Sequence, residues 1–142
     1  MRIVFASGNE GKVREINEML EGMPIELISL KAYPGAPEIQ EDGKTFQENA
    51  LKKARIISGF TGETVLADDS GLQVDILGGE PGIYSARYAG ENATDDDNIN
   101  LLLSRLEKIP QEQRTASFCC ALVLYQKDGK YDCFESRWKG LI

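Results

Sequence analysis

Two neighbouring carboxylates, Asp68 and Asp69, directly follow a short apolar run at residues 65–67. The run is typical of a buried strand, and the Ser70 and Gly71 that follow predict that this strand ends in a turn. Strand ends are where ligands bind in open α/β sheets. Because adjacent strand residues point to opposite faces, we expect one carboxylate to face a site and the other to hold local backbone. A solvated turn without a ligand is the alternative, since aspartate is common in turns.

A second polar segment, SGNEGK at residues 7–12, follows a predicted first strand at 2–6 and precedes a predicted helix that reaches about residue 20. Backbone N–H groups at such a helix start can bind an anion. Lys12 lies in the first turn, where the helix dipole disfavours a cation, and a bound anion would offset that cost. The segment is not a Walker A loop, because Val13 follows the lysine where Ser or Thr is needed. An ordinary strand-to-helix turn is the alternative interpretation.

Acidic residues gather in two further segments, a predicted loop at 31–43 that contains Glu38 and Glu41, and three aspartates at 95–97. The loop could be simply solvated, as most acidic loops are. Thr94 precedes the three aspartates as the predicted N-cap of a helix, and acidic residues in a first turn favour the helix dipole. We therefore interpret the three aspartates as helix-capping residues, although their pattern resembles a metal site.

Between these segments, Thr45 and Glu48 match a capping box and predict a helix over residues 45–58 that Gly59 ends. Four apolar residues of this helix would form its buried face, and four polar residues would fall on other faces: Phe46, Ala50, Ala54 and Ile57 on the first, and Asn49, Lys52, Lys53 and Arg55 on the others.

The rest of the chain predicts the remaining elements. A second strand at 25–30 follows the first helix, and Gly78, Gly79, Pro81 and Gly82 predict a tight bend after the Asp68 strand. The helix after Thr94 would bury Ile99, Leu102, Leu103 and Leu106, and Asp128-Gly129 predicts a hairpin between strands at 116–125 and 131–138. This order predicts the α/β class, as a single domain over residues 1–142 with a mixed twisted sheet flanked by helices.

Composition excludes several functions. The chain has 142 residues and a formal net charge of −7, which argues against broad nucleic-acid binding. No apolar run approaches the length of a membrane helix, so we expect no membrane partner. There is no histidine, and the three cysteines form no C-x-x-C pair, which argues against a zinc site, a His-activated nucleophile and a disulfide framework. We expect a cytoplasmic location.

Three motifs together resemble the inosine triphosphate pyrophosphatase family. They are S-G-N-x-x-K at residues 7–12, E-x-G-x-T-F-x-E-N-A at 41–50, and A-D-D-S-G-L-x-V-D-x-L-G-G-x-P-G-I-Y-S-A-R-Y at 67–88, with Lys53 between the last two. The resemblance implies hydrolysis of the non-standard purine nucleoside triphosphates ITP, dITP and XTP to the monophosphate and pyrophosphate. It also implies Mg²⁺ as cofactor, a role in cleansing the nucleotide pool, and a homodimer.

The resemblance also implies a role for each matching residue. Asp69 would be the proton acceptor and would hold Mg²⁺ together with either Glu38 or Glu41, two positions between which the sequence does not decide. The residues implied to contact the substrate are Ser7, Gly8, Asn9, Glu10, Gly11, Lys12, Lys53 and Ser70.

The sequence departs from the family in one respect. The family continues with an FGYDP-type segment and a Ser-His-Arg segment that recognise the base, and neither is present within residues 1–142. We therefore expect a chain truncated at its C-terminus, and the function named is that of the intact parent. A nucleotide-binding module without turnover is the alternative, and a purely structural domain is a third possibility.

Overall fold

The computed structural model describes all residues from 1 to 142. It contains three α-helices and five strands, joined by four short 3-10 helices. The α-helices are α1 (Glu10–Met19), α2 (Phe46–Thr61) and α3 (Asp95–Leu106), and the strands are β1 (Arg2–Phe5), β2 (Glu26–Ser29), β3 (Thr64–Val74), β4 (Thr115–Tyr125) and β5 (Tyr131–Leu141). None of the helices combines the length and the apolar character needed to cross a bilayer.

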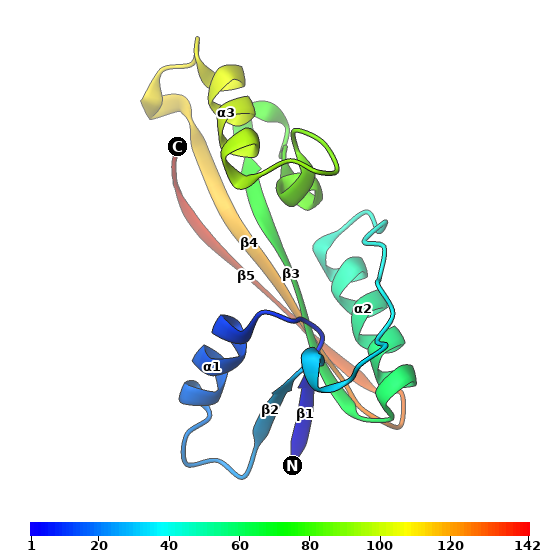
Figure 1. Ribbon diagram of the computed structural model, residues 1–142. Helices are drawn as coiled ribbons and strands as arrows, with labels where there is room; N and C mark the ends of the chain where they lie inside the picture. Colours follow the sequence, from blue (N-terminus) through cyan, green and yellow to red (C-terminus); the bar gives the residue numbers. More distant parts are fainter. The chain divides into compact units, whose positions relative to one another are not determined.

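The strands form one sheet in the order β2-β1-β3-β4-β5 (Figure 1). β1 pairs in parallel with β2 and with β3, so that Val4 lies beside both Ile28 and Val65. A tight turn joins β4 to β5, in which the Gln126 N–H donates to the Lys130 carbonyl at 2.8 Å. Parallel pairs on one side and a hairpin on the other confirm the predicted α/β class with a mixed sheet flanked by helices.

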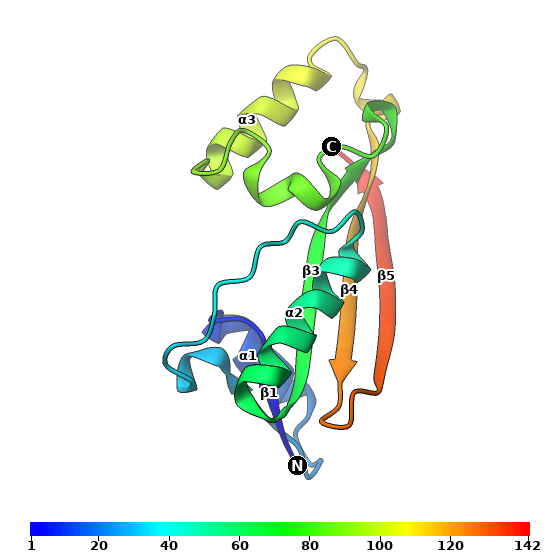
Figure 2. The same ribbon diagram turned by 90° about the vertical axis from the view of Figure 1, so that its right-hand side faces the viewer.

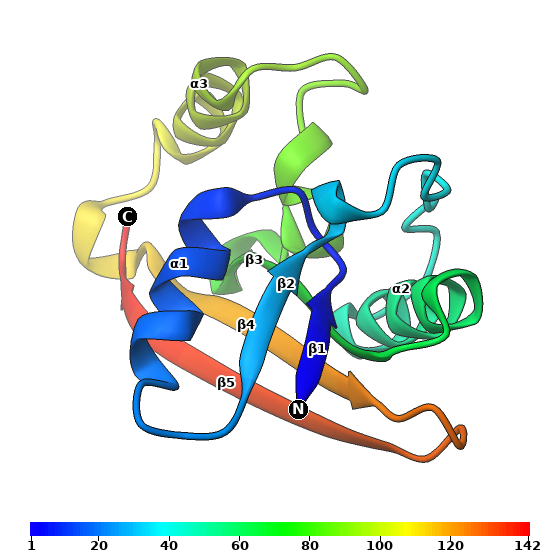
Figure 3. The ribbon, with the colours of Figure 1, turned by 60° about the horizontal axis from the view of Figure 1, so that its bottom comes forward.

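The chain divides into two compact units, and β3, β4 and β5 each run through both. The first unit contains residues 1–68 and 121–134. Its helices α1 and α2 cover opposite faces of β1, as Figure 3 shows. Alternate residues of the strands supply two cores. The core against α2 contains Val4, Ala6, Val65 and Ala67 with Ala50, Ala54 and Ile57 of the helix. The core against α1 contains Ile3, Phe5 and Leu27 with Val13 of the helix.

The second unit contains residues 69–120 and 135–142, and its core forms where α3 packs on Val74 and Ala116. Leu102 and Leu106 are buried there, but Ile99 and Leu103 are 52% and 43% exposed, so their predicted burial is wrong. The buried face of α3 is a single row of residues spaced four apart, Asn98, Leu102 and Leu106. One of these three residues is polar.

Asn98 links α3 to the 3-10 helix Gly82–Arg87, which lies beside it (Figure 2). Its Nδ2 donates to the Ala86 carbonyl at 3.1 Å, and its Oδ1 accepts from the Ala89 N–H at 2.8 Å. The bend that precedes this 3-10 helix is as tight as predicted. Gly78 and Gly79 have φ values of +67° and +92°, which favour glycine, and the Glu80–Pro81 peptide bond is cis.

α2 begins as predicted and ends later. The Thr45 Oγ1 accepts from the Glu48 N–H at 3.0 Å, which confirms Thr45 as N-cap. The Glu48 carboxylate bonds the Lys44 N–H at 2.7 Å rather than that of Thr45, so the predicted capping box is only half formed. The helix continues through Gly59 to Thr61 and ends at Gly62, which has the left-handed φ of +70° that Gly59 lacks.

Candidate active site

The glycine-bearing turn after β1 is built by its own side chains. Asn9 is the N-cap of α1, and its Oδ1 accepts from the Lys12 N–H at 3.1 Å. The Ser7 Oγ in turn accepts from the Asn9 N–H at 3.1 Å. Gly8 and Gly11 are exposed. The predicted strand, turn and helix start are therefore confirmed, and contact of residues 7–12 with a triphosphate stays a prediction.

The Lys12 side chain lies against β3. Its Nζ is 2.5 Å from the Asp68 Oδ2, and the Asp68 side chain is only 12% exposed. This carboxylate supplies the negative charge that offsets the cost of a lysine in the first turn of α1. The pair also places Lys12, a predicted phosphate ligand, at the edge where β1 has ended and β3 continues.

β3 does not end at the two aspartates, so the predicted turn at residues 68–71 is wrong. β1 pairs with β3 only from Ile3 to Phe5, opposite Thr64 to Leu66, and β3 continues to Val74. Asp68 and Asp69 therefore lie just beyond Leu66, the last residue of β3 that pairs with β1, and β3 itself continues to Val74. Burial alternates along it, with Asp69 at 8% exposure and Asp68 only partly buried, which confirms that the two point to opposite faces.

The backbone contact belongs to Asp69 rather than to Asp68. The Asp69 Oδ1 accepts from the N–H of the neighbouring Ser70 at 3.1 Å. Asp68 instead makes its ion pair with Lys12. The expectation that one carboxylate holds local backbone is met, and the one that does so is the predicted proton acceptor.

Lys53 of α2 connects the acidic loop to β3. Its Nζ is 2.6 Å from the Glu41 Oε1 and donates to the Asp68 main-chain carbonyl at 2.9 Å. The Lys53 side chain is only 14% exposed, so these contacts are largely shielded from water. Glu38, the other predicted metal ligand in the loop, is exposed and makes no ion pair. The structure thus brings Glu41, and not Glu38, to the lysine.

Across residues 1–142, no three Asp, Glu, Cys or His side chains lie close enough together to hold a metal ion. The predicted site needs only two carboxylates, Asp69 and one loop glutamate, so metal binding by them stays a prediction. Carboxylate oxygens fit a hard cation, and Glu41 already lies against one cation, the Lys53 ammonium, at 2.6 Å.

Sequence reasoning missed Asn49, which was expected on an outward face of α2 and is fully buried. Its Oδ1 accepts from the Gly43 N–H at 2.7 Å, where the acidic loop ends. The spacing contains a signal that could have found it. Asn49 is three residues after the buried Phe46 and eight before the buried Ile57, which puts all three on one side of a helix with 3.6 residues per turn.

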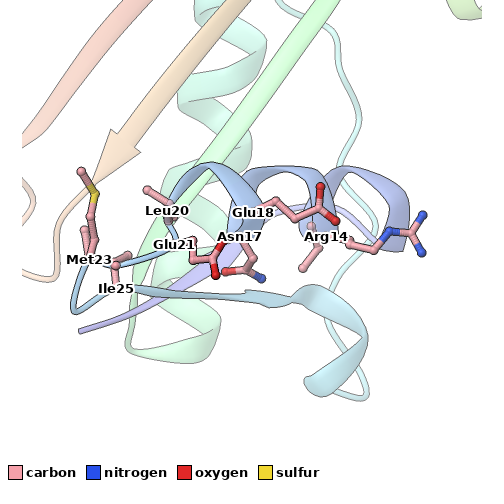
Figure 4. A pocket seen from close by; sticks show the side chains of 9 residues that line it. Arg14, Asn17, Glu18, Leu20, Glu21, Met23 and Ile25 are labelled. Atoms are coloured by element: carbon pink, nitrogen blue, oxygen red, sulfur yellow. The ribbon is translucent and has the colours of Figure 1, made fainter.

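A hollow of about 660 Å³ lies beside α1, and none of the residues that line it is a predicted site residue. Figure 4 shows side chains from the helix and from the following turn around it, among them Leu20, Met23 and Ile25. Asn17 on its wall is held by two hydrogen bonds of 2.9 Å to the Leu27 backbone. Nothing in this hollow contributes to the arrangement of Lys12, Lys53 and Glu41.

Comparison with known proteins shows which family this chain resembles. The model of the Ham1 family matches residues 3–142. A dITP/XTP pyrophosphatase of Geobacter sulfurreducens is 53% identical over 99% of this chain and 71% of its own length, and one of Desulforamulus reducens is 46% identical over the whole chain and 71% of its own length.

Two solved structures are also similar over the whole chain. A nucleoside-triphosphatase (dITP/XTP pyrophosphatase) from Mycobacterium abscessus is 44% identical with a TM-score of 0.89, and this chain covers 74% of it. A HAM1 protein from Coxiella burnetii is 40% identical with a TM-score of 0.92, and 73% of it is covered. The fold is that of an α/β protein of the kind seen in these structures, and the chain belongs to the Ham1 family.

Proposed function

We propose that this protein hydrolyses non-standard purine nucleoside triphosphates, ITP, dITP and XTP, to the monophosphate and pyrophosphate. The geometry that supports it best is the convergence of Lys12 and Lys53 on Asp68, beside the start of α1. Lys12 in the first turn of α1, with Lys53 of α2 reaching the same residue of β3, suits a polyphosphate, because ammonium groups and backbone N–H groups both favour negative charge. Relatives called dITP/XTP pyrophosphatases, 46–53% identical over essentially the whole chain, favour turnover over binding alone.

In this proposal the lysines bind and orient the phosphates. Lys12 exchanges its Asp68 partner for a phosphate oxygen, and Lys53 neutralises charge that develops on the departing pyrophosphate. Asp69 accepts a proton from the attacking water, whose oxygen forms the new bond to phosphorus as the anhydride bond between the α- and β-phosphates breaks. Its buried position and its bond to the Ser70 N–H hold the carboxylate in one orientation.

Mg²⁺ is the proposed cofactor, with Glu41 and Asp69 as the ligands that this chain supplies. When bound, it would neutralise phosphate charge and polarise the phosphoryl group. Hard carboxylate oxygens suit this ion, and the sequence has no histidine that could serve as base or ligand. Pyrophosphate release in excess EDTA should fall to background, and full turnover there would contradict the metal requirement.

The test of the function is pyrophosphate release from dITP and XTP at saturating Mg²⁺. Asp69→Asn keeps the shape of the side chain and loses the proton acceptor, so the rate should fall by about 10²–10⁴-fold. Asp68→Asn is the matched control on the same strand and should lose less. Thermal melts of both variants check folding. Retention of more than about a tenth of the rate by Asp69→Asn would remove Asp69 from this role.

We further propose a homodimer, as the family resemblance implies, and a cytoplasmic location, as the composition leads us to expect. Light scattering after size-exclusion chromatography distinguishes one copy of the chain from two. A mass of one protomer at micromolar concentration would contradict the dimer.

A further inference from the structure

Five contacts, one for each of residues 40–44, hold the acidic loop against α2. The Lys53 Nζ binds the Glu41 Oε1 at 2.6 Å, and the Lys52 Nζ binds the Gln40 carbonyl at 2.8 Å and the Asp42 Oδ1 at 2.6 Å. Next along the loop, the Asn49 Oδ1 accepts from the Gly43 N–H at 2.7 Å, and the Glu48 Oε2 from the Lys44 N–H at 2.7 Å. Residues 39–43 have no regular secondary structure of their own, so these contacts hold them in place.

These contacts differ in their exposure to water. The Lys52 and Asp42 side chains are 36% and 68% exposed, and the Glu48 bond is also exposed. Exposed ion pairs hold a loop weakly, because water and salt screen them. Asn49 has no exposed surface, and its oxygen reaches the loop from inside the core. It is therefore the one neutral, water-shielded anchor of the loop.

Gly43 shows how closely the loop is seated on this anchor. A Cβ added to Gly43 would lie 2.6 Å from the Asn49 Oδ1 and 3.0 Å from the Glu48 Cβ. Both distances are shorter than side-chain carbons normally approach, so the loop backbone passes Asn49 with no room for a side chain. The hydrogen bond and the lack of space for a Cβ both show that the Gly43 backbone lies directly against the Asn49 side chain.

Asn49 is also costly as a core residue. Its Nδ2 is buried and has no hydrogen-bond partner. A buried donor without an acceptor destabilises a fold, whereas an apolar side chain of similar size would not. Packing alone would favour leucine at this position, and the contact with Gly43 is what the asparagine provides.

We propose that Asn49 is a positioning residue that holds the acidic loop on α2 so that the Glu41 carboxylate stays against Lys53. Glu41 is two residues from Gly43, and Lys53 is one helical turn from Asn49, so the two contacts lie side by side. Without the Gly43 bond the loop keeps the shielded pair of Glu41 with Lys53 and its exposed contacts to Lys52 and Glu48. The backbone two residues after Glu41 then has no buried anchor, and Glu41 leaves Lys53 more often. The consequence for catalysis rests on the proposed function, whereas the positioning itself does not.

The test compares three variants of the full protein. Asn49→Leu keeps the bulk and removes the acceptor, and Gly43→Ala disturbs the same contact from the loop side. Ser58→Ala is the matched control, because the Ser58 Oγ makes a partly buried 2.7 Å bond to the Glu63 carbonyl at the far end of α2. The Ser58→Ala substitution should lower the melting temperature and leave the contacts of residues 40–44 unchanged.

The first readout is the exchange rate of the Gly43 backbone amide measured by NMR, which needs no turnover. The rate should rise by about tenfold or more in Asn49→Leu, since the amide loses its shielded acceptor, and should be unchanged in Ser58→Ala. The second is the Mg²⁺ concentration that gives half-maximal pyrophosphate release. It should rise by about 10–100-fold in Asn49→Leu and Gly43→Ala, as is usual when a residue that orients a metal ligand is lost.

An unchanged Gly43 exchange rate in Asn49→Leu would overturn the positioning role. An equal rise of half-maximal Mg²⁺ in Ser58→Ala would also overturn it, by showing a general effect of lost stability. If Asn49→Leu fails to fold, Gly43→Ala decides with the same Mg²⁺ readout and with the exchange rate of the Lys44 amide. If the wild-type protein releases no pyrophosphate, the proposed function fails, and the amide readout still decides whether Asn49 holds the loop.

Discussion

Two acidic segments lie beside helix N-termini in this chain, and their carboxylates meet different partners. In the loop before α2, Glu41 and Asp42 each pair with a lysine that projects from the helix, at 2.6 Å in both cases. In the first turn of α3, Asp97 is bound by its own cap, because its Oδ2 accepts from both the N–H and the Oγ1 of Thr94 at 2.8 Å.

The difference separates a carboxylate that is available for chemistry from one that is used by the fold. A lysine partner can leave for a phosphate, and the carboxylate is then available to a cation. A capping carboxylate stabilises the orphan N–H groups of its own helix and has no such alternative. Counting aspartates and glutamates therefore says less about a metal site than asking whether each one is paired with a side chain or with backbone.

The strongest test of this comparison is to neutralise one carboxylate in each segment. Glu41→Gln removes the charge that faces Lys53, and pyrophosphate release at a fixed Mg²⁺ concentration should fall by about 10–100-fold. Asp96→Asn, on the exposed first turn of α3, should stay within about twofold of wild type. Glu38→Gln separates the two loop glutamates, and a larger loss there than in Glu41→Gln would show that the wrong one has been chosen.

The helix starts themselves offer a second contrast, since the third residue of α1 is Lys12 and the third residue of α3 is Asp97. Lys12→Ala should weaken binding of a non-hydrolysable dITP analogue by about tenfold, a loss of one charge-assisted contact. It should weaken dIMP binding less, because a monophosphate carries less charge. Calorimetry gives both dissociation constants, and equal losses for the two ligands would count against Lys12 as a polyphosphate ligand.

The two threonine caps should affect stability alone. Thr94→Ala and Thr45→Ala should each lower the free energy of unfolding by about 1 kcal/mol. The Thr94 variant should lose more, because Asp97 closes a full capping box there whereas Glu48 bonds Lys44 instead. Denaturant unfolding measures the loss, and pyrophosphate release is the control. A Thr45 variant of normal stability without turnover would place that residue in the site.

Much of this structure could be predicted because its signals are local. The N-caps Thr45 and Thr94, the hairpin at Gly129 and the helix start after Ser7 depend on neighbouring residues, and each formed where predicted. Runs of apolar residues predicted where the strands lie, and the order of the elements predicted the mixed sheet.

What could not be predicted depends on residues far apart in the sequence. The pair of Lys12 with Asp68 joins positions 56 apart, and no local pattern encodes it. β3 runs past the aspartates because β4 continues beside it in the sheet, although Ser70-Gly71 alone would favour a turn. Asn49 is buried because the acidic loop folds back on α2 and its Gly43 N–H binds the asparagine oxygen. The helix sequence alone shows only a polar residue, which predicts exposure.

The smallest expected effect concerns the pKa values of Asp42 and Asp97. High salt should change the pKa of Asp42 and leave that of Asp97 unchanged. The Lys52 ammonium holds the pKa of Asp42 below its ordinary value, chiefly through their hydrogen bond, and the Thr94 N–H and hydroxyl do the same for the pKa of Asp97. Both depressed carboxyl pKa values give stability that is present above the unfolded-state pKa and is lost as pH falls through the folded-state pKa, that is, below about pH 4.

In 1 M NaCl the screening length is about 3 Å, so the exposed pair of Lys52 and Asp42 should loosen. The pKa of Asp42 should then move up towards its ordinary value. The Thr94 bonds to Asp97 are made within one helix turn by neutral groups, so the pKa of Asp97 should stay low. NMR titration of the two carboxyl carbons from pH 6 to 2, at low and at high salt, measures both. If the two pKa values respond equally to salt, the carboxylate before α2 is held as firmly as the cap of α3, and the contrast between a replaceable and a fixed partner fails.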